Sequence, residues 1–222
     1  TALYDGTWAS ADRVLERVAS RLQTLPIAKL DDATTGLNAK RKSAFIKLGG
    51  LNIDVTPVVW ARFRDAIDRY YMPQGRGSIW WKPTNPKEDQ RRLSQQNQAQ
   101  KGLVLPTIRM VKWWNQECNK ERLKGIHLEV MVERALAAHD LNGIGHALHL
   151  AFAGISDQLR NTCPDPTGLG PALDVNLSEA DRRDSCALSL AAWRCAISAT
   201  ALYQAGDTRG AQGAWREVFP KV

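Results

Sequence analysis

The chain has 222 residues, which is enough for one large domain or two small ones and for a core that needs no disulfides or metals. Hydrophobic residues make up 44% of the chain and charged residues 24%, a balance that excludes a collagen, a long disordered tail and a disulfide-rich miniprotein. The 30 basic and 23 acidic residues give a net charge of +7, which favours anionic partners such as nucleotides, although solubility alone would also account for it.

The sequence points to a cytoplasmic protein. It contains no run of 18 apolar residues, so no membrane-spanning helix is expected, and its first residues show no secretory signal. The four cysteines have neither C-x-x-C nor zinc spacing, which favours reduced thiols. Because the chain begins with Thr1 rather than Met, we expect a fragment or a trimmed chain.

The first predicted elements are a helix, a loop and a hairpin. Hydrophobic periodicity predicts an amphipathic helix over residues 9–24, and a polar loop is expected over 31–42. Two strands are predicted next, at Ser43–Leu48 and Leu51–Val59, joined by a tight glycine turn.

Asp54 is the most informative residue of this hairpin. Apolar and polar residues alternate along its strand, which places Asp54 and Thr56 on the face opposite Ile53 and Val55. A carboxylate on a strand is costly unless it meets solvent or a cation. One interpretation is an ordinary solvent-facing residue; the other is a ligand of Mg²⁺, a hard cation that prefers carboxylate and phosphate oxygens.

The second part of the chain is predicted to be helical. Residues 73–87 are rich in proline and glycine and are expected to link two lobes, a first lobe with the predicted strands at 1–72 and a helical lobe at 73–222. The overall class is therefore α+β with segregated elements. Helices are predicted at about 87–101, 105–118, 125–139, 142–160, 178–205 and 207–218.

Several segments together resemble a known family. The strand Leu51–Val59, the helix Leu105–Asn115, the segment Leu123–Val130, the Asp165-Pro166 turn and the closing helix Ala211–Pro220 resemble nucleotidyltransferases of the oligoadenylate synthase and cyclic GMP–AMP synthase type. The bacterial members are the CD-NTases of antiphage signalling. The resemblance implies an incomplete nucleotidyltransferase palm, with antiparallel strands and a helix, followed by an all-helical lobe.

The chain also departs from the family pattern. Members carry a Gly-Ser loop and a D-x-D strand before the helix read here at 9–24, and neither occurs in this sequence. Asp31 and Asp32 lie in a polar loop and are poor substitutes. Gly125 stands where the family usually has Ser, and Ile126 stands where an aromatic follows. With one of three usual carboxylates present, the 222 residues alone are expected to be inactive.

The resemblance assigns roles to individual residues. It implies that Asp54 is a catalytic carboxylate and metal ligand, with two Mg²⁺ ions expected at the site. It implies that Lys112 binds the triphosphate, where a point charge suits phosphate, with Lys124 and Gly125 beside it. The alternative for Lys112 is an ordinary solvated helix lysine.

Other residues are weaker candidates for the functional site. Lys82 and Thr84 are candidates for contacts with the acceptor nucleotide, while Trp81 is interpreted as a packing residue. His127 and Glu129 resemble an acid–base pair, but residues two apart on a helix point in different directions, so His127 is interpreted as packed and hydrogen-bonded. The remaining histidines, at 139, 146 and 149, are interpreted as surface residues rather than metal ligands.

The expected function is a nucleotidyltransferase that makes a cyclic or linear oligonucleotide second messenger from nucleoside triphosphates in antiphage signalling. Two alternatives stay open. One is a degenerate or truncated protein that binds nucleotide or a partner, and the other is an RNA-tailing nucleotidyltransferase that uses the positive charge to bind RNA. Nucleoside triphosphates are the expected partners, with protein regulators as a further class; no membrane partner is expected, and nucleic acid is not favoured.

Overall fold

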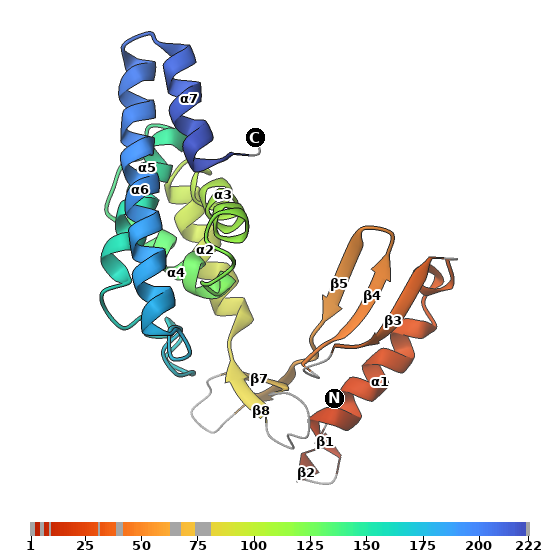
Figure 1. Ribbon diagram of the computed structural model, residues 1–222. Coiled ribbons are helices and arrows are strands. Elements are labelled where there is room, and N and C mark those ends of the chain that lie inside the picture. The colour runs from red at the N-terminus through yellow and green to blue at the C-terminus, as the bar shows by residue number, and fades with distance from the viewer. Residues whose placement is uncertain are drawn as a thin grey trace. The chain divides into compact units, whose positions relative to one another are not determined.

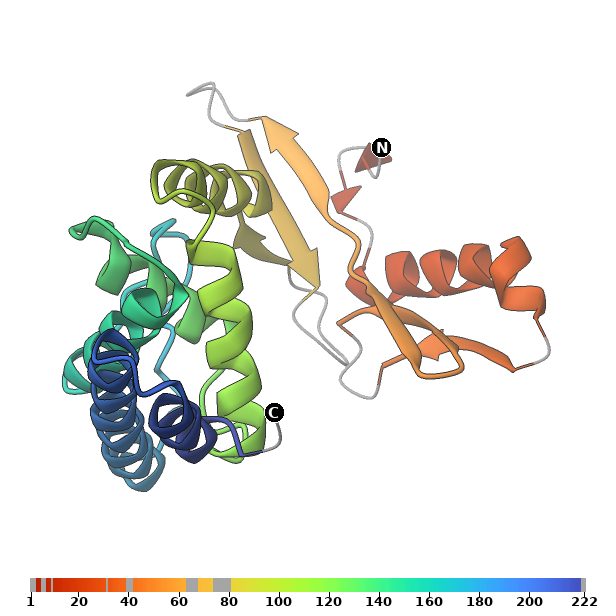
Figure 2. The same ribbon diagram turned by 90° about the horizontal axis from the view of Figure 1, so that it is seen from above.

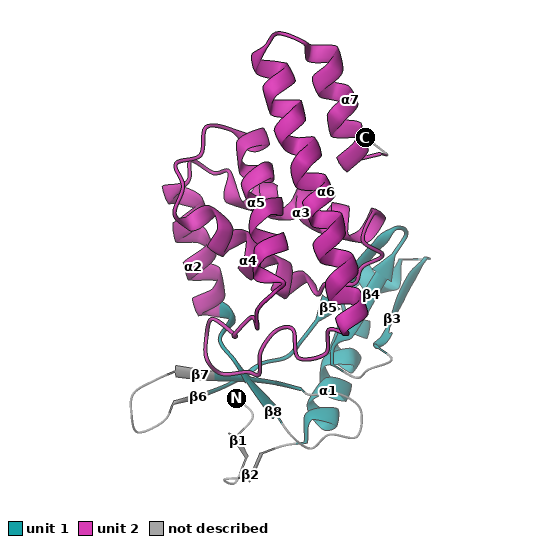
Figure 3. Ribbon diagram, turned by 60° about the vertical axis from the view of Figure 1, so that its left-hand side comes forward, with its two compact units in different colours: residues 1–86 teal, residues 87–222 magenta. Residues whose placement is uncertain are grey.

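The computed structural model describes residues 3–4, 7–8, 10–30, 32–38, 42–62, 68–73 and 81–220 (Figure 1). The chain divides into two compact units, which we call unit 1, Thr1–Pro86, and unit 2, Lys87–Val222 (Figure 3). Unit 1 holds the strands and one helix, and unit 2 is helical, so the predicted α+β class is confirmed.

Helix α1, Ala11–Gln23, forms as the hydrophobic pattern predicts. The hydroxyl of Ser10 caps it by accepting a hydrogen bond from the backbone N–H of Arg13 at 3.3 Å. The helix ends before Pro26, where a short 3₁₀ turn, Pro26–Lys29, begins. Its buried face carries Leu15 and Leu22.

A three-stranded antiparallel sheet packs against α1 (Figure 2). Its strands are β3 (Ala33–Leu37), β4 (Ala44–Leu48) and β5 (Leu51–Val55), in that order. Ala44 and Ile46 of β4 are buried against α1. Because side chains alternate along a strand, the opposite face of the sheet stays open within unit 1.

The loop expected at 31–42 is wrong over β3, which is a strand. Thr34 and Thr35 are β-branched and fit a pleated edge, and Gly36 opposes Phe45. A side chain at position 36 would come within 3.1 Å of the Phe45 ring, so glycine is what lets the ring lie over β3. In the sequence, the polar, glycine-containing composition that predicts a loop is more evident than the short pattern that would predict a strand.

The predicted strand 51–59 is also shorter than expected. It ends at Val55, and Val59–Arg62 forms β6 of a separate sheet with β7 (Asp68–Pro73) and β8 (Trp81–Thr84), in the order β6-β7-β8. Pro57 lies between the two strands and cannot donate a ladder hydrogen bond. Two-residue strands, Leu3–Tyr4 and Thr7–Trp8, pair with each other. The stretch expected to link two lobes contains β8, and the division between the units falls near its end.

Unit 2 contains six helices, each within two residues of its predicted bounds. Its core gathers large apolar side chains from several helices, with the Trp114 ring edge-on to Phe152 at 5.1 Å and Phe219 closing the end. The helices are α2 (Pro86–Ala99), α3 (Val104–Glu117), α4 (Gly125–Ala137), α5 (Ile144–Gln158), α6 (Glu179–Gln204) and α7 (Thr208–Val218).

Helix α6 has 26 residues, and its length and composition alone would allow it to cross a bilayer, although the sequence has no uninterrupted apolar run. A single helix of this kind is weak evidence, because the core helix of a soluble protein has the same properties. In unit 2, α6 packs against both α5 and α7, and its buried residues are small, among them Ser185, Ser189 and Ala196.

Candidate functional site

The open face of the β3–β5 sheet carries Asp54. Asp54 lies opposite Phe45 in the register between β4 and β5, and it is exposed. The alternation predicted from the sequence is therefore confirmed: the carboxylate points away from the face that packs on α1. Across strands β3, β4 and β5, Asp54 is the only carboxylate.

The surroundings of Asp54 are polar and shallow. The hydroxyl of the buried residue Ser43 donates a hydrogen bond to Oδ1 of Asp54 at 3.1 Å. A hollow of about 230 Å³ lies on this face between Asp54, Asn52 and Asn38. The ammonium of Lys47 lies 5.3 Å from the centre of the Phe45 ring beside it. An exposed carboxylate held by one hydrogen bond suits one coordination position of a hard cation.

A second candidate cluster lies in unit 2, where α3 meets the start of α4. The ammonium of Lys112, from α3, forms an ion pair with Glu129 of α4. The same ammonium lies 3.6 Å from the position that a Cβ atom would take at Gly125, the first residue of α4. Two of the predicted nucleotide-binding residues, Lys112 and Gly125, are thus brought together by the fold.

The connection between α3 and α4 is fixed by buried hydrogen bonds. The Asn115 side chain donates to the carbonyl of Leu123 at 2.9 Å and accepts from its N–H at 3.3 Å. Arg122 binds Asp181 and Asp184 of α6 through its guanidinium. These contacts hold the loop that sets where α4 begins, and therefore where Gly125 lies relative to Lys112.

The start of α4 suits an anion. Lys124 occupies the N-cap position and its side chain makes no capping hydrogen bond, so the first N–H groups of the helix have no side-chain acceptor. Free N–H groups and the helix dipole favour negative charge at this end. Lys124 and Gly125 are exposed, and Ile126, where the family has an aromatic residue, is 39% exposed.

Glu129 is the residue of this cluster that sequence reasoning missed as a partner. The sequence pattern relates Glu129 only to His127, two positions away. The useful spacing is instead from Gly125 to Glu129, which are four residues apart and so share a face of α4. Nothing in the local pattern shows that Lys112 of another helix meets that face.

Lys82 and Thr84 lie on β8 of unit 1, both half-buried. They are two residues apart on a strand, so they share one face, opposite Met72 and Tyr70 of β7. Trp81 is also half-buried. The contacts of these residues with a nucleotide stay predictions.

His127 is packed as expected, with 2% of its surface exposed. Its Nε2 atom has no hydrogen-bond partner among the described residues, so the expected full hydrogen bonding is not seen. Burial lowers the pKa of His127, and the charges of Arg182 and Lys124 lower it further, while Asp174 opposes them. The imidazole is thus held neutral.

The histidines at 146 and 149 lie next to each other on α5, with ring centres 5.1 Å apart. They line a hollow of about 890 Å³ with Trp215 and Tyr203. Within the described residues, no group of three His, Cys, Asp or Glu side chains is arranged to hold a metal ion.

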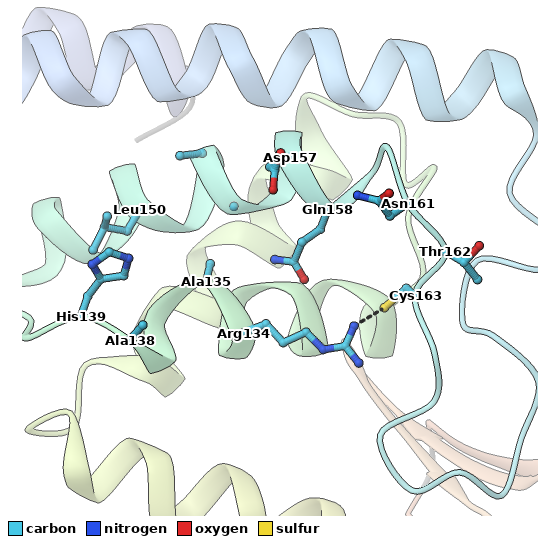
Figure 4. A pocket seen from close by; sticks show the side chains of 12 residues that line it. Arg134, Ala135, Ala138, His139, Leu150, Asp157, Gln158, Asn161, Thr162 and Cys163 are labelled. Atoms are coloured by element: carbon cyan, nitrogen blue, oxygen red, sulfur yellow. Dashed lines mark hydrogen bonds between the residues drawn. The ribbon is translucent and has the colours of Figure 1, made fainter.

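Another hollow of unit 2, about 650 Å³, lies along α4 and α5 (Figure 4). Its cation, Arg134, is already engaged: one guanidinium nitrogen donates to the Cys163 sulfur at 3.4 Å and another to the Pro164 carbonyl at 3.1 Å. Burial raises the pKa of the Cys163 thiol, which keeps it neutral.

Comparisons with known proteins agree with this architecture. No family model matches the chain. The sequence is 25% identical over 221 residues to a probable cyclic nucleotide synthase of Bacillus cereus (strain VD146), covering 97% of this chain and 63% of the relative. It is 27% identical over 123 residues to a cyclic AMP-AMP-AMP synthase of Acinetobacter sp., covering 54% of this chain and 34% of that relative.

Among solved structures, CdnC of E. coli MS115-1 with ATP matches 98% of this chain and 74% of its own, with a TM-score of 0.70 and 15% identity. The complex of the same protein with HORMA-deltaN matches 94% and 70%, with a TM-score of 0.68 and 16% identity. These likenesses establish the fold. The chain spans about 63% and 34% of the lengths of the two curated relatives.

Proposed function

We propose that the chain is a member of the CD-NTase family and acts within a Mg²⁺-dependent nucleotidyltransferase that joins nucleoside triphosphates into a cyclic or linear oligonucleotide second messenger. The observation that carries the proposal is the position of the Lys112 ammonium, 3.6 Å from the Cβ position of Gly125 at the start of α4. A cation and a helix N-terminus together bind a polyphosphate through charge and directed N–H groups.

In this proposal each residue has a defined task. Lys112 and the first N–H groups of α4 bind the triphosphate of the donor nucleotide, with exposed Lys124 adding positive charge. Asp54 provides one carboxylate for Mg²⁺, which when bound neutralises charge on the phosphates and on the leaving group. Lys82 and Thr84 contact the acceptor nucleotide.

The reaction is an in-line displacement. An acceptor hydroxyl oxygen forms a bond to the α-phosphorus while the bond from that phosphorus to the bridging oxygen breaks, and pyrophosphate leaves with the electron pair. The hydroxyl proton passes to a base or to water. The chain contributes by holding the triphosphate still, because positioning and charge stabilisation supply most of the catalysis in phosphoryl transfer.

The setting of this activity is proposed from the relatives. CdnC has been solved with a HORMA-deltaN protein, which supports a protein regulator here as well. The free thiols support a cytoplasmic location. The role that fits a second-messenger synthase of this family is antiphage signalling.

A second candidate function is nucleotide binding without catalysis. The observation that favours it is that Asp54 is the only carboxylate in strands β3–β5. One carboxylate cannot hold two mutually repelling dications at a spacing of about 3.5–4 Å.

One experiment separates these functions. The 222-residue protein and a longer polypeptide that includes a D-x-D strand are each incubated with all four labelled NTPs and Mg²⁺, with and without RNA, and products are resolved by chromatography. Short cyclic or linear oligonucleotides formed without RNA support the proposal. Extension of RNA would indicate a tailing enzyme, and retained binding with no product under any mixture would indicate a binding module.

A further inference from the structure

We infer that Glu129 is the positioning residue for the triphosphate-binding ammonium of Lys112. The inference rests on the proposed function, since it assigns Glu129 a task at the same phosphate site. Glu129 does not touch the nucleotide in this scheme. It acts through Lys112, by fixing where the ammonium lies above the first turn of α4.

The geometry of the two helices supports this assignment. Glu129 and Gly125 share one face of α4, and Lys112 reaches that face from α3. The ammonium contacts the Glu129 carboxylate and lies beside Gly125 at the same time. Lysine has three N–H donors, so one bond to Glu129 leaves two for phosphate oxygens. The Lys112 side chain is 39% exposed, so a ligand can reach it.

A held lysine binds phosphate better than a free one. Lysine has a flexible four-carbon stem, and immobilising such a side chain on binding costs about 0.5–1.5 kcal/mol. The ion pair with Glu129 orders the stem before the nucleotide arrives.

The test uses the 222-residue chain and inorganic tripolyphosphate as the probe, because this ligand has the phosphates without a base. Binding is measured by calorimetric titration for the wild type, Glu129→Ala, Glu129→Gln, Lys112→Ala and the Lys112→Ala/Glu129→Ala double variant. Glu129→Ala should weaken binding about three- to tenfold, the fold-change that corresponds to loss of one ordered side chain. Glu129→Gln keeps a side-chain oxygen in the same place and should stay within about twofold of the wild type.

The double variant decides whether Glu129 acts through Lys112. With Lys112 already replaced, Glu129→Ala should have no further effect on tripolyphosphate affinity. A residue that only stabilised the fold would lower the melting temperature and leave the affinity of the folded protein unchanged. The matched control is the exposed ion pair between Lys101 and Asp140, 2.9 Å apart. Replacing either of these residues, or both, by alanine should leave the tripolyphosphate affinity unchanged.

The outcomes distinguish the inference from the proposed function. If Lys112→Ala leaves tripolyphosphate binding unchanged, the proposed phosphate site is wrong and the inference falls with it. If Lys112→Ala weakens binding but Glu129→Ala does not, or strengthens it, only the positioning role is wrong. Equal losses from Glu129→Ala with and without Lys112 would also overturn that role.

Discussion

At the scale of single residues, the chemistry is concentrated in a few exposed charges. Asp54 lies on the open face of a sheet, and Lys112 lies where two helices meet, paired with Glu129. Both side chains remain accessible, and each is held by one defined partner. Each side chain is therefore held in place and is still accessible to a ligand.

Replacing Lys112 by alanine should weaken ATP binding by about 1–2 kcal/mol, or roughly five- to thirtyfold, as expected for loss of a charged contact that is partly exposed. Isothermal titration with ATP and with adenosine provides the measurement. Adenosine lacks phosphates, so its affinity should not depend on Lys112. An equal loss of affinity for both ligands would show that the lysine does not bind the triphosphate.

Asp54→Asn should abolish product formation by an active form of the protein while leaving its fold intact. The amide oxygen can still accept the hydrogen bond from Ser43, but it lacks the charge that binds Mg²⁺. Product from labelled NTPs and the thermal melting temperature are measured together. Full activity of this variant would remove Asp54 from the metal site.

At the scale of elements, the start of α4 is the part of the chain best suited to an anion. Its position depends on the α3–α4 loop, which Asn115 ties to Leu123 and Arg122 ties to α6. The helix alone would provide a weak site, whose strength is limited to its first turn. The proposed site adds to it the ammonium of Lys112, 3.6 Å from the Cβ position of Gly125.

Gly125→Ser should strengthen triphosphate binding about three- to tenfold, because a hydroxyl adds one donor at the start of α4. A Cβ at this position would lie 3.5 Å from Cε of Lys112, an ordinary contact, so the lysine need not move. Gly125→Ala is the matched control, since it adds the Cβ without the hydroxyl. An equal gain in both variants would attribute the effect to the helix rather than to the donor.

Helix α4 also makes the stability of unit 2 depend on pH. The pKa of His127 in the folded protein lies below its usual value of 6.5, chiefly because of burial, so the unfolded chain binds the proton more readily. Stability should therefore be complete above about pH 6.5 and fall as the pH drops below it. Urea unfolding between pH 8 and pH 5 measures this slope. His127→Phe should flatten it, and an unchanged slope would assign the effect to other groups, such as His149, whose pKa burial also lowers.

At the scale of the whole molecule, binding and catalysis make different demands on the chain. The proposed phosphate site, Lys112 and the start of α4, lies within unit 2. Catalysis with two Mg²⁺ ions needs several carboxylates on a rigid sheet, and strands β3–β5 carry Asp54 alone.

The 222-residue polypeptide is therefore expected to bind ATP without turning it over. A longer polypeptide that includes a D-x-D strand should form an oligonucleotide product in Mg²⁺, and the same Lys112→Ala change should reduce it. Both polypeptides are compared by ATP titration and by product formation from labelled NTPs. Clear Mg²⁺-dependent product from the 222 residues would show that other carboxylates, such as Asp31 and Asp32, complete the site.

The sequence by itself determined the elements with long, regular patterns. Helices α1 and α4 follow from a 3.6-residue apolar period, the other helices of unit 2 follow from the turns that separate them, and the position of Asp54 follows from strict alternation along β5. It also identified Lys112 and Gly125, through the resemblance. Strand β3 and the separate β6-β7-β8 sheet did not follow, because short strands are stabilised by pairing with distant segments rather than by their own composition.

Only the tertiary structure decided which side chains meet. The contact between Lys112 and Glu129 joins residues 17 positions apart on two helices, and it depends on a loop that buried Asn115 fixes. Local periodicity shows which face of a helix is buried, but not which charge from another helix lies against its exposed end. That choice is made by packing and by buried hydrogen bonds, which act between segments that the linear sequence keeps apart.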